Sequence, residues 1–379
     1  MPKEDGKISA GVEDVASWLG DPDRLSVQRA VGEIRAGRPV KLLGQGGDNH
    51  IVAAAEMLGG ENVISWHAAT DGAVGLVLPA PRLLHLGFVA QGPARLELAG
   101  LKEEDVDAML LAVAPRVPVV PLRPALDAEI AALELVKRAY LLPAAIVLPA
   151  GSNDSGTMVE VSATAIERFH ELAAQDLAIA ARTRVPLADS VDTEFVVFRG
   201  GDGLHDQLAI VIGDPDPGAP VLTRLHSACL TGDLFGSLKC DCGDQLRLAV
   251  GEIADEGSGV LLYLDQEGRG IGLLNKMRAY GLQELGHDTV DADAVLGYGP
   301  DERRYEVAGA MLSLLGFRKI TLMTNNLGKI TALESFGVDV VGHRRLIGPV
   351  NPHNHNYLTT KAERAGHLLG EIARHGGRK

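Results

Sequence analysis

Hydrophobic residues recur along this chain at two spacings, and these spacings predict an alternation of helices and strands. Residues 27–34 carry apolar side chains at helical spacing, and residues 39–43 then form a short apolar run that is typical of a buried strand. The same reasoning predicts helices over residues 126–140 and 163–182 and a strand over residues 144–149. Helical periodicity dominates this first half, which indicates an α/β or α+β domain.

The pattern changes near residue 188, where strand-like runs begin to alternate with helical segments. Strands are predicted over residues 195–198, 207–212, 221–225, 259–264 and 320–323, and helices over residues 246–253, 274–285 and 307–315. Such an alternation predicts a mixed sheet with helices packed on it. We therefore expect an α/β (α+β) fold of two domains, residues 1–188 and 189–379, and the length of 379 residues also favours two domains.

Composition and charge narrow the class of protein. No apolar run reaches the roughly 18 residues that a membrane-spanning helix needs, and residues 1–6 lack the apolar core of a signal peptide. Clustered reduced thiols favour the cytoplasm over an oxidising compartment. The formal net charge of -14 opposes binding to nucleic acid in general. An anionic substrate would therefore need locally placed Arg, Lys and backbone N–H groups.

All three cysteines of the chain lie close together in the sequence, at Cys229, Cys240 and Cys242. An odd number of thiols cannot all pair as disulfides. Three thiolates can hold one Zn²⁺ at about 2.3 Å each and leave the fourth tetrahedral position for water, which is the arrangement of a catalytic zinc site. Two alternatives stay open. The thiols are buried and inert, or His226 supplies a fourth ligand and closes the site.

Two polar turns are in position to contact phosphate groups. Residues 266–272, with the sequence QEGRGIG, directly follow a predicted strand, so that backbone N–H groups can approach a phosphate and Arg269 can add a bidentate contact. Thr324 and Lys329 flank a second turn between a strand and a helix. The alternative for both segments is an ordinary turn that binds nothing.

Asp301 follows the turn at residues 297–300 and precedes a helical pattern. Acidic residues are favoured at the N-cap and in the first turn of a helix. Spacing alone therefore favours a capping role for Asp301 over a chemical one.

In combination, these segments resemble GTP cyclohydrolase II over about residues 190–370. The residues that carry the resemblance are 224–233 (RLHSACLTGD), 236–246 (GSLKCDCGDQL), 266–269 (QEGR), 275–280 (NKMRAY), 301–303 (DER), 324–326 (TNN) with Lys329, and 351–354 (NPHN), 357–358 and 360–361 in the tail. They occur in the order of that family, and their combination is highly specific although no single one is.

The resemblance implies hydrolysis of GTP with release of formate and diphosphate, which leaves a diaminopyrimidinone ribosyl phosphate for riboflavin biosynthesis. It implies Zn²⁺ held by the three cysteines, Mg²⁺ with the GTP phosphates, and a homodimer. Asp301 would act as proton acceptor, and Arg303 as the nucleophile that takes the α-phosphate. GTP would be held by Arg224, Leu225, His226, Ser227, Ala228, Gln245, Glu267, Gly268, Arg269, Thr289, Thr324 and Lys329.

Two positions depart from the family pattern. Ala228 stands where many members have Glu, and Lys239 stands where Arg is common, which keeps the charge but loses bidentate geometry. Either change could alter the rate or the product. Two alternative functions therefore stay open: a related purine-nucleotide hydrolase that yields a formylated product, and a GTP-binding regulator with a structural zinc.

The first half resembles a degenerate 3,4-dihydroxy-2-butanone 4-phosphate synthase, the usual fusion partner of that family. Residues 47–50 (GDNH), 53–56 (AAAE) and 152–158 (SNDSGTM) are similar to landmarks of the synthase. Its acidic Mg²⁺-binding run is missing from residues 43–47, and its His-Thr-Glu segment is missing near residues 127–130. We therefore expect a scaffold rather than a second enzyme.

Overall fold

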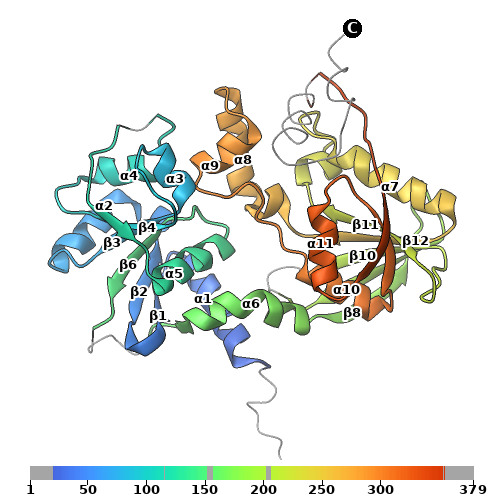
Figure 1. Cartoon of the computed structure of the whole chain (residues 1–379), viewed down its shortest axis with the longest axis horizontal. Helices are drawn as coiled ribbons and strands as arrows, with labels where there is room; N and C mark the ends of the chain where they lie inside the picture. The colour runs from blue at the N-terminus through green and yellow to red at the C-terminus, as the bar shows by residue number, and fades with distance from the viewer. Residues whose placement is uncertain (1–19, 115, 152–156, 202–205, 353, 355–379) are drawn as a thin grey trace, which may run out of the picture.

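The computed structural model of the chain describes residues 20–114, 116–151, 157–201, 206–352 and 354, and it has two seven-stranded mixed sheets, each with its own helices (Figure 1). This arrangement confirms the expected α/β (α+β) class and the mixed sheet of the second half. Within these described ranges, no helix is long and apolar enough to cross a membrane.

The first sheet has the strand order β5-β4-β3-β6-β2-β1-β7 and is antiparallel except where β1 pairs with β7. Its strands are β1 (Val40–Leu43), β2 (His50–Ala54), β3 (Gly75–Leu78), β4 (Ala94–Glu97), β5 (Leu122–Pro124), β6 (Ala145–Pro149) and β7 (Glu160–Ser162). Its helices are α1 (Pro22–Arg35), α2 (Ala55–Ala69), α3 (Ala80–His85), α4 (Glu103–Leu111), α5 (Asp127–Arg138) and α6 (Ala163–Gln175), with a short 3₁₀ turn at Gln45–Gly47.

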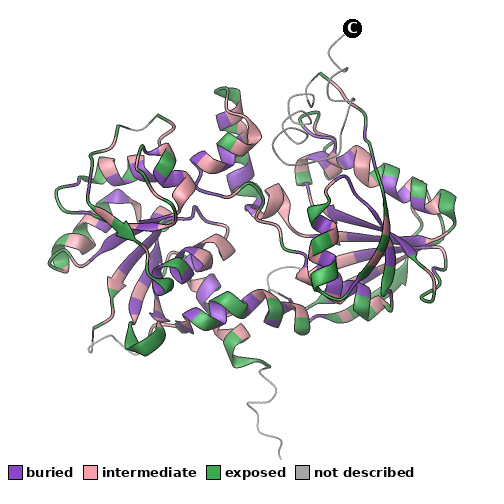
Figure 2. Cartoon of the chain, in the orientation of Figure 1, coloured by how far each residue is buried: buried purple, intermediate pink, exposed green. Residues whose placement is uncertain are grey.

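Both faces of the first sheet are covered. Along β3, Val77 packs with α1, α5 and α6, whereas Leu76 and Leu78 pack on the opposite side with α2, α3 and α4. This alternation follows from the two-residue period of a strand. Because both faces are buried, the central strands β3 and β6 lack polar alternation, and the sequence revealed helices here more readily than strands (Figure 2).

The second sheet has the strand order β14-β13-β11-β12-β10-β9-β8. Its strands are β8 (Ala178–Arg184), β9 (Thr193–Arg199), β10 (Gln207–Ile212), β11 (Val221–Ser227), β12 (Gly259–Leu264), β13 (Lys319–Met323) and β14 (Asp339–Arg344). Its helices are α7 (Cys242–Glu256), α8 (Gly272–Glu284), α9 (Thr289–Val295), α10 (Glu306–Leu315) and α11 (Gly328–Ser335), with short helical turns at Leu230–Leu234 and Glu267–Gly270. Helix α7 packs on one face, and α10 and α11 pack on the other.

The helix predicted over residues 163–182 is too long. Helix α6 ends at Gln175, and Ala178–Arg184 is instead strand β8, which pairs antiparallel with β9. The pairing partner lies farther along the chain, so local periodicity could not reveal it. The second sheet therefore begins before residue 188, where the sequence places the domain boundary.

Helices α8 and α9 lie between the two sheets, and α9 packs against α3 (Figure 1). Leu142, which follows α5 in the first half, is buried in one apolar cluster with residues of α8, α9 and the segment after α9. Helix α10 also packs against α6. The two halves of the chain thus share buried surface next to the loops that follow the strands of the second sheet.

Candidate active site

A cavity of about 620 Å³ opens at one edge of the second sheet. Strand β11 pairs in parallel with β12 on one side and with β13 on the other, so the carboxyl ends of the three strands meet at this edge. The turns that follow them come from distant parts of the sequence but converge here, which is the usual ligand position in sheets with parallel strands.

Every residue to which the sequence assigned a site role lines this one cavity. The residues are Arg224, Leu225, His226, Ser227, Ala228, Cys229, Cys240, Cys242, Gln245, Glu267, Gly268, Arg269, Thr289, Asp301, Arg303, Thr324 and Lys329. The cavity also gathers five cationic side chains in a chain of net negative charge, namely Arg224, Arg269, Lys276, Arg303 and Lys329. Such a cluster is suited to a polyanionic ligand.

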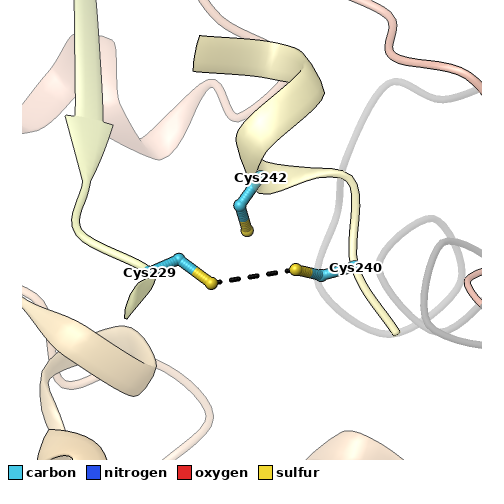
Figure 3. Close-up of side chains that lie close together, drawn as sticks. All are labelled: Cys229, Cys240 and Cys242. Carbon is cyan, nitrogen blue, oxygen red and sulfur yellow. Dashed lines mark hydrogen bonds between the residues drawn. The ribbon is translucent and has the colours of Figure 1, made fainter. Parts of the chain in front are cut away.

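The three thiols converge at the start of α7 and the end of β11 (Figure 3). Among the described residues they form the one cluster of potential metal ligands, with their sulfur atoms all within 4.8 Å of one another. The Sγ atoms of Cys229 and Cys240 are 3.7 Å apart. A tetrahedral zinc with sulfur at about 2.3 Å requires a sulfur separation of about 3.8 Å, so the thiols fit zinc.

The surroundings of the thiols also suit a cation. A Cβ atom at Gly232 would lie 2.9 Å from Sγ of Cys240 and 3.0 Å from Sγ of Cys229, so only glycine fits beside them. Hydrogen bonds with Cys240 and Cys242 lower the pKa of Cys229, whereas the hydrogen bond with Cys229 raises the pKa of Cys240 to about 11. A bound cation would stabilise all three groups as thiolates.

Asp233 organises the first of these thiols. Its carboxylate accepts hydrogen bonds from the backbone N–H of Cys229 at 2.9 Å, from the hydroxyl of Tyr263 at 2.9 Å and from Nε2 of His226 at 3.1 Å. Burial lowers the pKa of His226, although Asp233 opposes this shift. His226 thus directs Nε2 to a carboxylate, and it stands outside the three-thiol cluster.

Lys276 of α8 connects the thiols to the glycine-rich turn. Its Nζ lies 3.1 Å from Sγ of Cys229, 3.0 Å from Oγ1 of Thr231 and 2.7 Å from Oε1 of Glu267. The other oxygen of Glu267 accepts the backbone N–H of Leu230 at 2.6 Å. Both oxygens of Glu267 therefore hold protein groups together.

Arg224 is buried beneath the cavity. It donates to the carbonyl of Met323 at 2.8 Å and to Oε1 of Gln245 at 2.6 Å, and both acceptors are uncharged. Burial lowers its pKa to about 10, which the nearby Asp241 only partly opposes. Within the described structure, its Nε and the hydroxyls of Ser227 and Tyr305 are buried without a hydrogen-bond partner. Cavity-lining polar atoms of this kind favour a bound polar ligand.

Asp301 does not cap a helix, so the interpretation from spacing alone is wrong. Helix α10 begins at Glu306, and its N-cap residue is Tyr305, without a side-chain cap. Asp301 and Arg303 lie in the preceding loop, where Nε of Arg303 donates to Oδ1 of Asp301 at 2.8 Å. Burial would raise the pKa of Asp301, but the hydrogen bonds from Arg303 outweigh it and hold this pKa below its usual value.

Two residues with positive φ, Arg269 and Gly270, allow the Asp301 loop to lie beside the glycine-rich turn. A Cβ atom at Gly270, whose φ is +91°, would lie 2.8 Å from the carbonyl of Glu302. Arg269 has a φ of +61°. Its backbone carbonyl accepts a hydrogen bond from the N–H of Glu302 at 3.1 Å, and its guanidinium forms an ion pair with Asp293 at 3.3 Å. The turn therefore supports the Asp301 loop as well as lining the cavity.

Hydrogen bonds fix the turn after β13. The hydroxyl of Thr324 accepts the N–H of Asn326 at 3.0 Å, and Nζ of Lys329 donates to the carbonyl of Leu225 at 3.1 Å. Thr289 lines the cavity from the first turn of α9, which Asp288 caps.

Several cavity residues received no role from the sequence. Lys276 and Tyr280 lie in the quoted run 275–280, and Tyr305 follows the run 301–303. Their position in or next to these runs was the sequence signal that could have identified them as cavity residues. Of the two departures from the family pattern, Ala228 lines the cavity, whereas Lys239 is exposed and pairs with Glu284 at 3.0 Å.

Some predicted landmarks lie outside the described residues. These are residues 152–156 of the first half and, in the tail, residue 353 with the runs at 357–358 and 360–361.

Comparison with known proteins gives a consistent result. The sequence profile of the family described as GTP cyclohydrolase II matches residues 178–345. A protein named GTP cyclohydrolase-2 from Xylella fastidiosa is 41% identical over 355 residues, which cover 93% of this chain and 89% of that protein. Another of that name, from Azotobacter vinelandii, is 56% identical over 190 residues, which cover 49% of this chain and 91% of that protein.

Among solved structures, the chain is similar to RibBX, a two domain 3,4-dihydroxy-2-butanone 4-phosphate synthase from A. baumannii. The TM-score is 0.32 at 19% sequence identity, and the match covers 85% of this chain and 99% of that one.

Proposed function

Since this chain belongs to the GTP cyclohydrolase II family, we propose that the cavity at the carboxyl edge of its second sheet binds and hydrolyses GTP. The family's activity makes the chain an enzyme of riboflavin biosynthesis, which converts GTP to a diaminopyrimidinone ribosyl phosphate, formate and diphosphate. The observation that carries the assignment of the site is the meeting of three thiols, Asp301 and Arg303 in one cavity.

We propose zinc as the metal of the three thiols, because the donor set and the sulfur separation fit it. When bound, zinc supplies a Lewis acid that activates water near neutral pH. Within the chain, Asp233 and Lys276 fix the position of Cys229, and all three thiols line the cavity.

We propose that GTP lies across the turns that follow β11, β12 and β13. Arg224, whose hydrogen-bond acceptors among the described residues are uncharged, and the hydroxyl of Ser227, which has no partner among them, provide polar groups at the cavity floor. Arg269 and Lys329 place positive charge on the turns that follow β12 and β13. Mg²⁺ that accompanies GTP would offset further negative charge of the triphosphate.

Asp301 and Arg303 are proposed to act on the α-phosphate. An arginine is protonated at neutral pH and is then a poor nucleophile. The carboxylate of Asp301 lies 2.8 Å from Nε of Arg303 and is held in its ionised form, so it can accept the proton as the N–P bond forms and diphosphate leaves.

A homodimer is proposed from the resemblance and from one exposed surface. Leu234, Phe235 and Leu238 lie between the first and second zinc-site cysteines, and their exposed fractions are 69%, 73% and 59%. Large exposed apolar side chains that gather on one short segment favour a protein interface. Light scattering tests this: a dimer mass that Phe235→Asp reduces to a monomer mass is expected.

The first half is proposed to be a scaffold without synthase activity. The synthase reaction enolises ribulose 5-phosphate on carboxylate-held Mg²⁺. Residues 43–48 offer the single carboxylate of Asp48, which lies 3.6 Å from His50. We expect no butanone phosphate from ribulose 5-phosphate and Mg²⁺. Its detection would contradict the scaffold role.

Mass analysis of the product tests the proposed function. Purified protein incubated with GTP and Mg²⁺ should yield the deformylated pyrimidinone. A product that retains the formyl group would indicate the related hydrolase, and GTP binding without turnover would indicate a regulator with a structural zinc.

A further inference from the structure

The loop that carries Asp301 and Arg303 is held from two sides. It spans residues 296–305, between α9 and α10. On the side of the second sheet, the carbonyl of Arg269 accepts the N–H of Glu302. On the other side, the loop contacts the first half of the chain, at the end of α5 and in the turn between α5 and β6 (residues 139–144).

One contact is an ion pair between the halves. Nζ of Lys137, in the last turn of α5, lies 2.8 Å from Oε2 of Glu302, and the two side chains are only 20% and 16% exposed. The other oxygen of Glu302 accepts the backbone N–H of Gly299 at 2.8 Å. One carboxylate therefore ties the loop to itself and to α5, at the position between Asp301 and Arg303.

A second set of contacts uses the backbone of the α5–β6 turn. The carbonyl of Leu141 accepts the hydroxyl of Tyr298 at 2.7 Å, and the carbonyl of Tyr140 accepts Nδ2 of Asn275 at 3.0 Å. Asn275 also donates to the hydroxyl of Tyr298 at 2.9 Å, which closes a buried network. Tyr140 adopts a φ of +59°, a backbone conformation that residues other than glycine rarely adopt.

Packing surrounds this network. Leu142 is 1% exposed and Tyr298 is 2% exposed, in one apolar cluster with residues of α8 and α9. A Cβ atom at Gly297 would lie 3.0 Å from Pro143 of the turn. The two halves therefore pack closely through both polar and apolar contacts.

We propose that the first half of the chain positions the catalytic loop, with Lys137 as a positioning residue for Asp301 and Arg303. This inference rests on the proposed function of those two residues. Lys137 acts through Glu302 and does not line the cavity. The strained turn at Tyr140 fixes the carbonyls that hold Tyr298 and α8. The first half thus contributes to GTP turnover although it makes no contact with the reacting atoms.

Loss of the ion pair is expected to displace Asp301 and Arg303 and so to lower the rate of turnover. Glu302 lies directly between Asp301 and Arg303, so loss of the ion pair removes one of the two attachments of the segment that carries the proton acceptor and the nucleophile. A misplacement of about 1 Å at a reacting group can cost about 100-fold in rate. Zinc binding, in contrast, depends on residues of other loops and should be untouched.

Lys137→Met in the full chain tests the proposal, because it removes the charge and keeps the apolar stem. We expect kcat for formate release to fall about tenfold or more, with zinc content and KM for GTP near those of the native protein. Lys137→Arg should restore most of the rate. The control is Glu134→Gln, which removes the second partner of Lys137, at 3.1 Å, but leaves the pair with Glu302 intact.

Hydrogen exchange gives a readout that needs no GTP turnover. Amides of residues 296–305 should exchange faster in Lys137→Met than in Glu134→Gln, while those of β11 and β12 stay unchanged. Equal exchange and equal kcat in the two variants would overturn the proposal. If Lys137→Met does not fold, Glu302→Gln gives the same comparison. If the native protein lacks GTP turnover but the exchange difference is present, the proposed function fails and the positioning of the loop stands.

Discussion

Nζ of Lys276 lies 3.1 Å from Sγ of Cys229 and joins a zinc-site thiol to the carboxylate of Glu267. Burial alone would lower the pKa of Lys276, but its hydrogen bond with Glu267 and the charge at Cys229 raise this pKa above its usual value. The ammonium group therefore stays charged and offsets part of the negative charge of three thiolates. It also links the metal site to the turn that supports the Asp301 loop.

Lys276→Met should reduce turnover about 10- to 100-fold, which is the usual effect of losing a partner of a metal ligand. The reason is that Cys229 and Glu267 lose their shared donor. Formate release at saturating GTP and zinc content measure the effect. Lys319→Met, which removes an exposed lysine of β13 that does not line the cavity, is the control. Equal rates in the two variants would show that Lys276 is only a packing residue.

Replacement of a thiol and of the neighbouring histidine should have opposite effects on metal content. Cys240→Ser should lose both zinc and activity, whereas His226→Ala should keep about one zinc per chain, because His226 directs Nε2 to Asp233. Metal analysis of the purified variants distinguishes them. Loss of zinc from His226→Ala would instead indicate a closed, four-ligand structural site.

Arg303→Ala should fold normally and lose nearly all turnover, because it removes the proposed nucleophile. Its loop precedes α10, so no helix cap is lost. Ser162→Ala is the contrasting variant, because Ser162 caps α6 and its loss should lower stability by about 0.5–2 kcal/mol with little effect on the rate. An Arg303→Ala enzyme with near-native turnover would exclude the catalytic role.

Asp293 predicts a pH dependence of stability. Burial raises its pKa to about 7, although Arg269 opposes the shift, and its ordinary value is 3.8. The folded protein therefore binds a proton that the unfolded chain releases, so the stability from this group is complete below pH 3.8 and is lost as the pH rises through about 7. Between pH 5 and pH 8, the melting temperature of Asp293→Asn should therefore rise relative to that of the native protein. Exposed Asp255 provides the control, Asp255→Asn, whose difference from the native protein should stay constant.

The sequence predicted what local patterns determine. Helix α5 and strand β12 follow directly from apolar spacing, and the cavity residues follow from runs whose order is specific to one family. Strand β8 was mistaken for a helix end because its identity depends on pairing with β9, which is a tertiary contact. Asp301 was mistaken for a cap because a loop that another turn supports has no signature in spacing.

The contacts between the two halves were beyond sequence reasoning for a similar reason. Lys137 reads as an ordinary charge in the last turn of a helix, and its role depends on Glu302, far along the chain. Tyr140 has no sequence signal for its left-handed conformation. Only the fold brings such positions together.

Formate release from GTP by metal-stripped protein, before and after zinc is restored, tests the central claim most directly. We expect no formate without zinc and, after about one equivalent of Zn²⁺ per chain is added with Mg²⁺ present, equal amounts of formate and diphosphate. Cys240→Ser should release neither under either condition. Zinc-restored native protein that binds GTP but releases neither product would contradict the account.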